Sequence, residues 1–201
     1  MNRDNGYLEI ILGSMYSKKT TTLINIYNQC TFCNIPVAVI NHSYDTRYHD
    51  TMLSTHDKQM IPCIQTSNIT NIWDYNSVDK SFTQNAQYHL QLRLAKVILI
   101  NEAQFFEKDD IYNSVFSMLE NNKKVYVCGL DGDFQRKKFG HILDLIPLCD
   151  KVTKLTSLCS TCKDGTPGIF TSRLTSEKMQ TLIGSDNYIP VCRKCYSLKD
   201  L

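Results

Sequence analysis

Short apolar runs alternate with longer amphipathic stretches along the first three quarters of the chain, and this alternation constrains the fold more strongly than any other feature. The runs are rich in Val, Ile and Leu, as strands covered on both faces are, and they occupy residues 7–12, 37–41, 97–101 and 125–130. The helix candidates between them are residues 20–32, 80–95 and 110–119. We expect Asp109 or Asp110 to cap the third helix. Strands that alternate with helices predict an α/β fold in which a parallel sheet carries helices on both faces.

The last quarter of the chain has a different composition. After about residue 154 it holds two cysteine pairs, several Gly and Pro residues, and only short strand-like pieces such as residues 168–172. This composition indicates a small lobe organised by a metal rather than another βα unit. We therefore expect two domains, an α/β domain over residues 1–154 and a small metal-organised lobe over residues 155–201.

Length and charge exclude several functional classes. A chain of 201 residues accommodates one α/β domain with a small appendage, and it needs no disulfide framework to fold. Its 22 basic and 20 acidic residues leave a net charge of +2, which argues against a nucleic-acid partner. We find no signal peptide and no run of about 18 apolar residues, which predicts a soluble cytoplasmic protein with no membrane partner. In a reducing compartment, paired cysteines are interpreted first as metal ligands.

Residues 13–20, GSMYSKKT, follow the first predicted strand and precede the first predicted helix. Phosphate-binding loops have the pattern G-x-x-x-x-G-K-[ST], which Gly13, Lys19 and Thr20 match. In such a loop, backbone amides and the helix N-terminus hold the phosphates, the lysine reaches the β- and γ-phosphates, and the Thr hydroxyl helps to hold Mg²⁺. Lys18 replaces the second glycine, and keeping the glycine conformation there costs about 1–3 kcal/mol. The alternative is an ordinary strand–turn–helix connection with a lysine-rich turn.

Two polar residues, Asn101 and Glu102, lie at the end of the third predicted strand. Asn101 stands where phosphate-loop enzymes carry an acidic residue for Mg²⁺, and its amide oxygen is a weaker ligand for a hard cation than a carboxylate. Glu102 comes next, at the strand end where ligands of open α/β sheets bind, and it is a candidate base for a substrate hydroxyl. The alternative for Glu102 is a solvated residue at a strand end.

Four cysteines of the last quarter form two C-x₂-C pairs: Cys159, Cys162, Cys192 and Cys195. Thiolates with this paired spacing are typical of a closed tetrahedral structural Zn²⁺ site. Two incidental pairs, or transient disulfides, are the alternative. Cys30 and Cys33 have the same spacing but no second pair, so we expect free thiols there. We expect core or near-surface positions for the remaining cysteines: Cys63, Cys128 and Cys149.

These motifs, taken in order along the chain, match a known family. GSMYSKKT is followed by DTRY at 45–48, THD at 55–57, NEAQFF at 101–106, LDGDFQRKKFG at 130–140 and the paired cysteines. The chain resembles the type II thymidine kinases, the cellular cytosolic, bacterial and poxvirus-type enzymes, from about Leu8 to Tyr196. A single motif of this kind is modest support, whereas six in the same order are highly specific.

The resemblance implies a P-loop NTPase-like kinase domain and a zinc-binding lobe whose lasso loop covers the substrate. It implies that Glu102 is the catalytic base, that the four paired cysteines bind structural zinc, and that Thr20 and Asn101 hold Mg²⁺. The ATP-binding residues that it implies are Gly13, Ser14, Met15, Tyr16, Ser17, Lys18, Lys19, Thr20, Asp45, Thr46, Arg47, Asn101 and Gln104. The substrate-binding residues that it implies are Met15, Phe105, Leu130, Phe134, Phe139, Thr171, Met179, Gln180, Thr181, Leu182, Ile183, Gly184 and Tyr188. For the apolar residues, simple core packing is the alternative.

The resemblance also implies an activity and its partners. Such an enzyme transfers the γ-phosphate of ATP to the 5′-hydroxyl of thymidine and so makes dTMP; the resemblance further implies a homotetramer that dTTP inhibits. Lys18 and Asn101 leave a second interpretation open, a nucleotide-binding relative with weakened catalysis. A zinc-ribbon protein that binds nucleic acid is a third interpretation, which the near-neutral charge disfavours.

Overall fold

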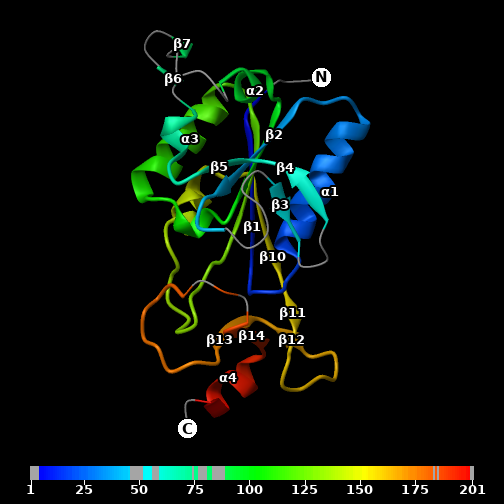
Figure 1. Ribbon diagram of the computed structural model, residues 1–201, viewed down its shortest axis with the longest axis vertical. Helices are drawn as coiled ribbons and strands as arrows, with labels where there is room; N and C mark the ends of the chain where they lie inside the picture. The colour runs from blue at the N-terminus through cyan, green and yellow to red at the C-terminus, as the bar shows by residue number, and fades with distance from the viewer. Residues whose placement is uncertain are drawn as a thin grey trace.

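A six-stranded sheet forms the centre of the molecule (Figure 1). The computed structural model describes residues 5–45, 52–55, 59–73, 75–76, 81–82, 89–182, 184 and 186–199. Neighbouring strands of the sheet are all parallel, in the order β10-β1-β9-β8-β2-β5. In chain order these strands are β1 (Tyr7–Gly13), β2 (Val37–His42), β5 (Ile64–Thr66), β8 (Val97–Asn101), β9 (Lys124–Gly129) and β10 (Lys151–Leu155). The predicted parallel α/β sheet is confirmed.

Four of the six strands coincide with the predicted apolar runs to within one residue at each end: β1, β2, β8 and β9. The sequence does not predict the two strands at the edges of the sheet, β5 and β10. β5 has only three residues. β10 reads KVTKL and leaves Val152 exposed to solvent, so it carries no buried apolar run. An edge strand is covered less completely than a central one, and the apolar signal is correspondingly weaker.

Helices lie on both faces of the sheet, as predicted (Figure 1). They are α1 (Lys19–Phe32), α2 (His89–Leu94), α3 (Lys108–Glu120) and the 3₁₀ helices η1 (Ile69–Asn71), η2 (Ala103–Phe105) and η3 (Ile142–Leu148). The helices predicted at residues 20–32 and 110–119 are confirmed as α1 and α3. Of the helix predicted at residues 80–95, the structure describes only 81–82 and 89–95; 81–82 form a short strand, and α2 begins at His89.

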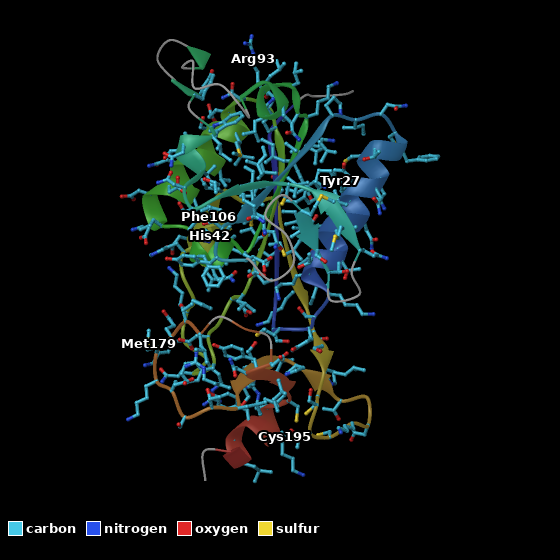
Figure 2. The ribbon with its side chains drawn as sticks, viewed as in Figure 1. Tyr27, His42, Arg93, Phe106, Met179 and Cys195 are labelled. Atoms are coloured by element: carbon cyan, nitrogen blue, oxygen red, sulfur yellow. The ribbon has the colours of Figure 1, made fainter. Side chains whose placement is uncertain are left out.

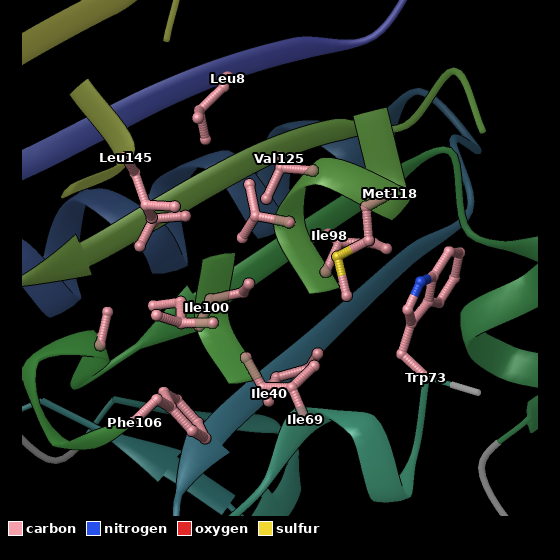
Figure 3. Close-up of a cluster of buried hydrophobic side chains, with 14 of the residues drawn as sticks. Leu8, Ile40, Ile69, Trp73, Ile98, Ile100, Phe106, Met118, Val125 and Leu145 are labelled. Atoms are coloured by element: carbon pink, nitrogen blue, oxygen red, sulfur yellow. The ribbon is translucent and has the colours of Figure 1, made fainter. Parts of the chain in front are cut away.

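Each face of the sheet has its own apolar core, because successive side chains of a strand point to opposite faces. On one face, Leu8 and Ile10 of β1 pack with side chains of α3 and η3 (Figure 3). On the other face, Ile11 packs with residues of α1. Tyr27 of α1 and Phe106 after η2 mark the two sides of the sheet in Figure 2. Burial on both faces is the physical reason for the near-continuous Val, Ile and Leu runs.

The predicted cap of the third helix is wrong. The residue that precedes α3 is Glu107, and its side chain makes no capping hydrogen bond; Asp109 lies inside the first turn. The Asp110 carboxylate instead accepts hydrogen bonds from the backbone N–H groups of Ile69 and Thr70, both at 2.9 Å. Asp110 therefore binds the start of η1, a segment 40 residues away in the sequence, which no local capping rule identifies.

The remaining strands pair in small sheets of two. The hairpin of β3 (Met52–Ser54) and β4 (Met60–Pro62) adds Leu53 and Ile61 to the core on the α1 side, and β6 (Tyr75–Asn76) pairs with β7 (Ser81–Phe82). The C-terminal part contains β11 (Ser157–Leu158), β12 (Pro167–Gly168), β13 (Phe170–Arg173), β14 (Tyr188–Val191) and α4 (Arg193–Lys199).

These C-terminal elements form a separate lobe beyond the end of the central sheet (Figure 1). In it β11 pairs with β12 and β13 with β14, both antiparallel. The strand-like piece predicted at residues 168–172 is divided between β12 and β13. The domain boundary near residue 154 stays a prediction. No helix in the described ranges is long and apolar enough to cross a membrane.

Candidate active site

The loop between β1 and α1 contains two residues other than glycine in the left-handed region. Lys18 adopts the left-handed conformation, with φ 64° and ψ 27°, where the pattern has glycine. Tyr16 is also left-handed, with φ 62°. A side chain in this region costs about 1–2 kcal/mol relative to the right-handed form. The predicted strain at Lys18 is therefore present, because this lysine adopts the conformation that the glycine of the pattern would supply.

Gly13, the first residue of the loop pattern, is required by space. Its φ of 157° is unusual for other residues, and a Cβ built on it would lie 2.5 Å from Ser17 Oγ and 2.6 Å from the carbonyl oxygen of Leu155. The Ser17 hydroxyl is buried, and no group within the described ranges hydrogen-bonds to it. Lys19 Nζ donates to the carbonyl oxygen of Ser14 at 2.8 Å. A helix N-terminus with a buried, unsatisfied hydroxyl and a lysine folded over the loop fits an anionic ligand such as a phosphate.

A cavity of about 290 Å³ opens beside this loop. Its lining comes from the phosphate loop, from residues at or just after the ends of β2, β3 and β8, from the loop after β9, and from the C-terminal lobe. Its size is near the lower end of small-molecule sites. The predicted residues that line it are Met15, Tyr16, Ser17, Lys18, Lys19, Thr20, Asp45, Glu102, Gln104, Phe105, Leu130, Phe134, Phe139, Thr171, Gln180, Thr181, Leu182, Gly184 and Tyr188. The fold therefore brings nearly all of the predicted site together.

Four predicted residues do not line the cavity: Gly13, Ser14, Asn101 and Met179. The Met179 side chain is 75% exposed and points away from the body of the molecule (Figure 2), and its carbonyl oxygen accepts a hydrogen bond from Arg173. Thr46, Arg47 and Ile183 lie outside the described residues. The binding roles of all the predicted residues stay predictions.

Asn101 reaches the cavity only through its neighbours. Its side chain is buried, and its Nδ2 donates to Asn41 Oδ1 at 2.8 Å, since the two residues are paired across β8 and β2. Asn41 Nδ2 in turn donates to Asp45 Oδ2 at 3.3 Å. Asp45 is almost buried and lines the cavity, so a carboxylate lies at the end of this chain of amides. A direct contact between Asn101 and Mg²⁺ stays a prediction, whereas Asp45 is an acidic oxygen donor that lines the cavity beside the phosphate loop.

Glu102 lies at the centre of the cavity wall in a strained backbone conformation. Its φ of 53° is left-handed, a feature that clusters at functional sites. Gln104 Nε2 donates to Glu102 Oε2 at 2.6 Å, while Gln104 Oε1 accepts from the N–H of Leu130 at 3.0 Å. Gln104, which the resemblance assigns to the ATP side, thus joins the carboxylate to the loop after β9. That loop turns at Gly140, where a Cβ would meet the Gln104 carbonyl oxygen.

Several lining residues were not predicted: Thr21, Tyr44, Ser54, Thr55, Gly132 and Asp133. Asp133 Oδ1 accepts from the backbone N–H groups of Gln135 and Lys137, and Asp133 Oδ2 accepts from Gln180 Nε2 at 2.8 Å. Asp133 therefore ties the loop after β9 to the C-terminal loop. Residues 130–140 belong to the matched motif, but the role of Asp133 depends on its contact with Gln180, which lies 47 residues further along the chain.

An aromatic wall stands behind one side of the cavity. His42 is buried against the rings of Tyr44, Phe105 and Phe106, at centroid distances of 4.7, 5.6 and 4.6 Å. Burial lowers the pKa of His42, against the opposing effect of the Glu102 and Asp110 charges. The ring is thus neutral at pH 7, and its Nδ1 accepts from the N–H of Tyr44 at 3.0 Å. His42 is a satisfied polar residue that supports the wall.

The four paired cysteines meet in the C-terminal lobe as predicted. Their sulfur atoms all lie within 4.8 Å of one another, a group able to hold a metal ion: Cys159, Cys162, Cys192 and Cys195. Sulfurs placed tetrahedrally about 2.3 Å from a zinc ion are about 3.8 Å apart, so the donor set fits. Burial raises the pKa of the Cys159 thiol, but hydrogen bonds from the N–H groups of Cys162 and Cys192 outweigh this and lower the pKa to about 6. This metal group lies at the base of the lobe, near Cys195 in Figure 2.

The remaining cysteines are free thiols. Cys30 is buried in α1 and Cys33 is exposed at its end, as expected for a pair with no second pair of ligands. Cys128 is buried in β9, whereas Cys63 and Cys149 are half-buried. Burial raises the pKa of the Cys63 and Cys128 thiols to about 12, so both are protonated at neutral pH.

The lobe docks directly on the phosphate loop. Ser14 Oγ donates to the carbonyl oxygen of Gly168 at 2.9 Å, and the N–H of Met15 donates to Thr171 Oγ1 at 3.0 Å. The lobe that carries the cysteine group therefore also completes the cavity. A loop with the phosphate-binding pattern, joined in one cavity to a strand-end carboxylate and a covering lobe, is typical of the kinase class.

Comparison with known proteins identifies the family. The sequence model of the family described as "Thymidine kinase" matches residues 6–196. The chain is 37% identical to the thymidine kinase of Sheeppox virus (strain KS-1), over 98% of this chain and 99% of that protein. It is 38% identical to thymidine kinase a of Arabidopsis thaliana and 36% identical to the cytosolic thymidine kinase of Bos taurus, over 96% and 98% of this chain and 76% and 75% of those proteins. The chain belongs to the thymidine kinase family.

Proposed function

We propose that this protein transfers the γ-phosphate of ATP to the 5′-hydroxyl of thymidine, giving dTMP. The observation that supports the proposal is a single cavity whose lining includes the phosphate loop, Glu102 and an aromatic chamber formed around Phe105 and Phe139. Phosphoryl transfer depends on positioning and electrostatic stabilisation, so donor and acceptor must share such a space. The names of the similar proteins support thymidine as the acceptor.

Glu102 is the base in this proposal. Its carboxylate accepts the proton of the 5′-hydroxyl as the hydroxyl oxygen bonds to the γ-phosphorus and the bond to the β-phosphate oxygen breaks. Gln104 donates to one oxygen of the carboxylate and keeps it turned into the cavity. The strained backbone of Glu102 supports the assignment, because a left-handed glutamate persists only where the surrounding contacts hold it.

The phosphate loop binds the triphosphate. Lys19 and the backbone amides of residues 14–20 suit the β- and γ-phosphates, and the buried Ser17 hydroxyl gains a partner when a phosphate oxygen is near. Mg²⁺ bound with ATP supplies charge neutralisation at the phosphates. Thr20 and Asp45 are oxygen donors on the same wall, with Asn101 behind Asp45. Lys18 adopts the left-handed conformation in place of the glycine, and no observation favours the weakened relative.

The aromatic chamber suits the planar pyrimidine ring. Phe105 and Phe139 meet edge to face at 5.7 Å, and Met15, Leu130 and Tyr188 complete the apolar lining. Gln180, Thr181, Leu182 and Gly184 also line the cavity, and backbone amide and carbonyl groups there suit the donor and acceptor edge of a base. A closed site of this kind excludes water and so limits the hydrolysis of ATP.

We further propose that the metal of the cysteine group is a structural Zn²⁺. The printed name of the cattle relative supports a cytoplasmic location. A homotetramer and inhibition by dTTP follow from the resemblance and are proposed on that basis alone.

Labelled thymidine, ATP and Mg²⁺ incubated with the purified protein test the activity directly. We expect dTMP to form, and we expect Glu102→Gln to lower kcat by about 10²–10⁴-fold, because it removes the base while keeping the shape of the side chain. Glu107→Gln is the matched control, since Glu107 is exposed next to α3 and does not line the cavity. Folded, metal-loaded protein that makes no dTMP would contradict the proposal, and so would a Glu102→Gln variant as active as the control.

A further inference from the structure

Arg173 is a buried cation at the end of β13 that no predicted role includes. Only 4% of its surface is exposed, although arginine is almost never buried without partners. Its guanidinium lies 3.8 Å from the centroid of the Phe134 ring and 5.1 Å from that of Tyr188. Both rings line the cavity, but Arg173 itself does not. Arg173 therefore lies directly behind the wall that faces the substrate.

The Arg173 guanidinium donates hydrogen bonds to the loop that follows β13. Nη1 donates to the carbonyl oxygens of Glu177 at 2.8 Å and Met179 at 2.5 Å, and Nη2 donates to that of Gln180 at 3.0 Å. Nη2 also donates to the Tyr188 hydroxyl at 2.6 Å. One side chain thus holds three peptide groups of the loop and the first residue of β14. Hydrogen bonds from a charged donor contribute more to stability than neutral ones.

Two further hydrogen bonds connect the Arg173 hub, meaning Arg173 with the groups that it donates to, with the lining of the cavity. The Tyr188 hydroxyl donates to the carbonyl oxygen of Leu182 at 3.2 Å, and Gln180 Nε2 donates to Asp133. Gln180, Thr181, Leu182 and Tyr188 all line the cavity. Because the C=O and N–H of a planar trans peptide point in opposite directions, carbonyls that face the guanidinium turn the N–H groups of Gln180 and Thr181 away from it. These N–H groups belong to residues that line the cavity, so they are placed to meet the edge of a bound base.

We propose that Arg173 is the positioning residue for nucleoside recognition: it shapes residues 177–182 and Tyr188 so that their backbone reads the base. The inference rests on the proposed function, because it assumes that the occupant of the chamber is a nucleoside. Arginine suits the task because its planar group carries five donors in a fixed fork and stacks on aromatic rings, whereas lysine is a compact point charge. The metal group holds the two ends of the loop, and Arg173 sets the shape between them.

Arg173→Lys tests the proposal, because it keeps the positive charge and removes the fork. We expect the thymidine KM to rise about tenfold or more, which corresponds to about 1.4 kcal/mol of lost binding. The kcat should fall less than about threefold and the ATP KM should stay unchanged, since the hydrogen bonds of Arg173 hold Glu177, Met179, Gln180 and Tyr188, on the side that the proposal assigns to the nucleoside. A purely structural role would instead lower kcat, metal content and thermal stability together.

Arg136→Lys is the matched control. The Arg136 guanidinium also stacks on aromatic rings, at 4.3 Å from Tyr196 and 5.6 Å from Phe170, but neither ring lines the cavity. We expect its thymidine KM to equal that of the wild type. An unchanged KM in Arg173→Lys, or an equal rise in both variants, would overturn the proposal.

Limited proteolysis separates this proposal from the proposed function. Arg173→Lys should speed cleavage between residues 174 and 187 several-fold in protein without nucleoside, whereas Arg136→Lys should not. If the wild type makes no dTMP, the proposed function fails, while unchanged cleavage overturns the role of Arg173 independently. If the Arg173→Lys variant does not retain metal, Tyr188→Phe is used in its place. This substitution removes one of the groups that accept a hydrogen bond from Arg173, so the thymidine KM should rise about threefold, in line with one neutral hydrogen bond. An unchanged KM in Tyr188→Phe also overturns the proposal.

Discussion

The central sheet and the C-terminal lobe are stabilised by different means. The sheet buries two large apolar clusters, one on each face. The buried cluster of the lobe has four members, and two of these, Cys159 and Cys192, belong to the metal group. Since apolar burial stabilises by about 25 cal/mol per Å², the lobe gains little from its own core. We therefore expect the sheet to support itself, and we expect the lobe to depend on a metal ion and on a few charged hydrogen bonds.

Removal of the metal should produce the largest difference in stability between the lobe and the sheet. Structural zinc contributes about 10–16 kcal/mol to the folding of small zinc domains, so Cys159→Ser or treatment with a chelator should unfold the lobe and abolish thymidine phosphorylation. Trp73, the one tryptophan, lies in the core next to α3, and its fluorescence reports the sheet. We expect the unfolding midpoint measured at Trp73 to stay unchanged.

Cys63→Ser is the control for this experiment, because Cys63 is a free thiol outside the metal group. It should change neither activity nor the midpoint appreciably. A Trp73 transition that shifts together with metal loss would mean that the two regions unfold as one cooperative unit.

A cavity in the sheet core should give the next largest effect. Ile98 of β8 is fully buried, so Ile98→Ala should lower the free energy of unfolding by about 2–5 kcal/mol. Val152→Ala, on the exposed edge strand β10, should cost less than about 0.5 kcal/mol. Urea unfolding followed at Trp73 measures both. Metal affinity should be the same in both variants, and a loss of metal in Ile98→Ala would show that the lobe relies on the sheet core.

Two left-handed lysines allow the same substitution to be made in each region. Lys18 of the phosphate loop has φ 64° and Lys163 of the lobe has φ 54°. Replacing either by glycine removes a strain of about 1 kcal/mol. Lys18→Gly should raise the Trp73 midpoint, whereas Lys163→Gly should slow metal release and leave that midpoint unchanged. Equal shifts of the Trp73 midpoint in the two variants would contradict the independence of the regions.

The smallest effect concerns pH and the sheet alone. Burial raises the pKa of the Glu9 carboxyl. Hydrogen bonds from Thr153, Lys151 and Tyr7 lower it by more, so the pKa of Glu9 lies below its usual value. Because the folded pKa is the lower one, the contribution to stability is present above the unfolded pKa and is lost as pH falls through the folded value. Glu9→Gln should therefore cost less than about 1 kcal/mol at pH 7.

The measurement is the unfolding free energy of wild type and Glu9→Gln at a series of pH values. Their difference should be constant from pH 7 to about 5 and should shrink below about 4.3, the ordinary value for glutamate. Since metal release at low pH affects both proteins equally, it cancels in the difference. A difference that grows toward acid would reverse the sign of the proposed linkage.

Local patterns predicted the elements that bury a continuous apolar face. β1, β2, β8 and β9 were all found from their composition, because a strand covered on both faces must be apolar along its length. The edge strands β5 and β10 and the two-residue strands of the lobe lack that signal, since they bury little surface. The cysteine pairs were found for another local reason, the fixed spacing that a metal knuckle requires.

The sequence by itself determined the four central strands, the paired cysteines and the residue types of the cavity, because each depends on spacing along the chain. Only the tertiary structure decided that Asp110 binds η1, that Asn101 is joined to Asp45 through Asn41, and that Arg173 holds the carbonyls of Glu177, Met179 and Gln180. The physical reason is that a polar side chain can donate or accept in several directions. Which partner it finds is decided by segments that the fold brings together from distant parts of the chain.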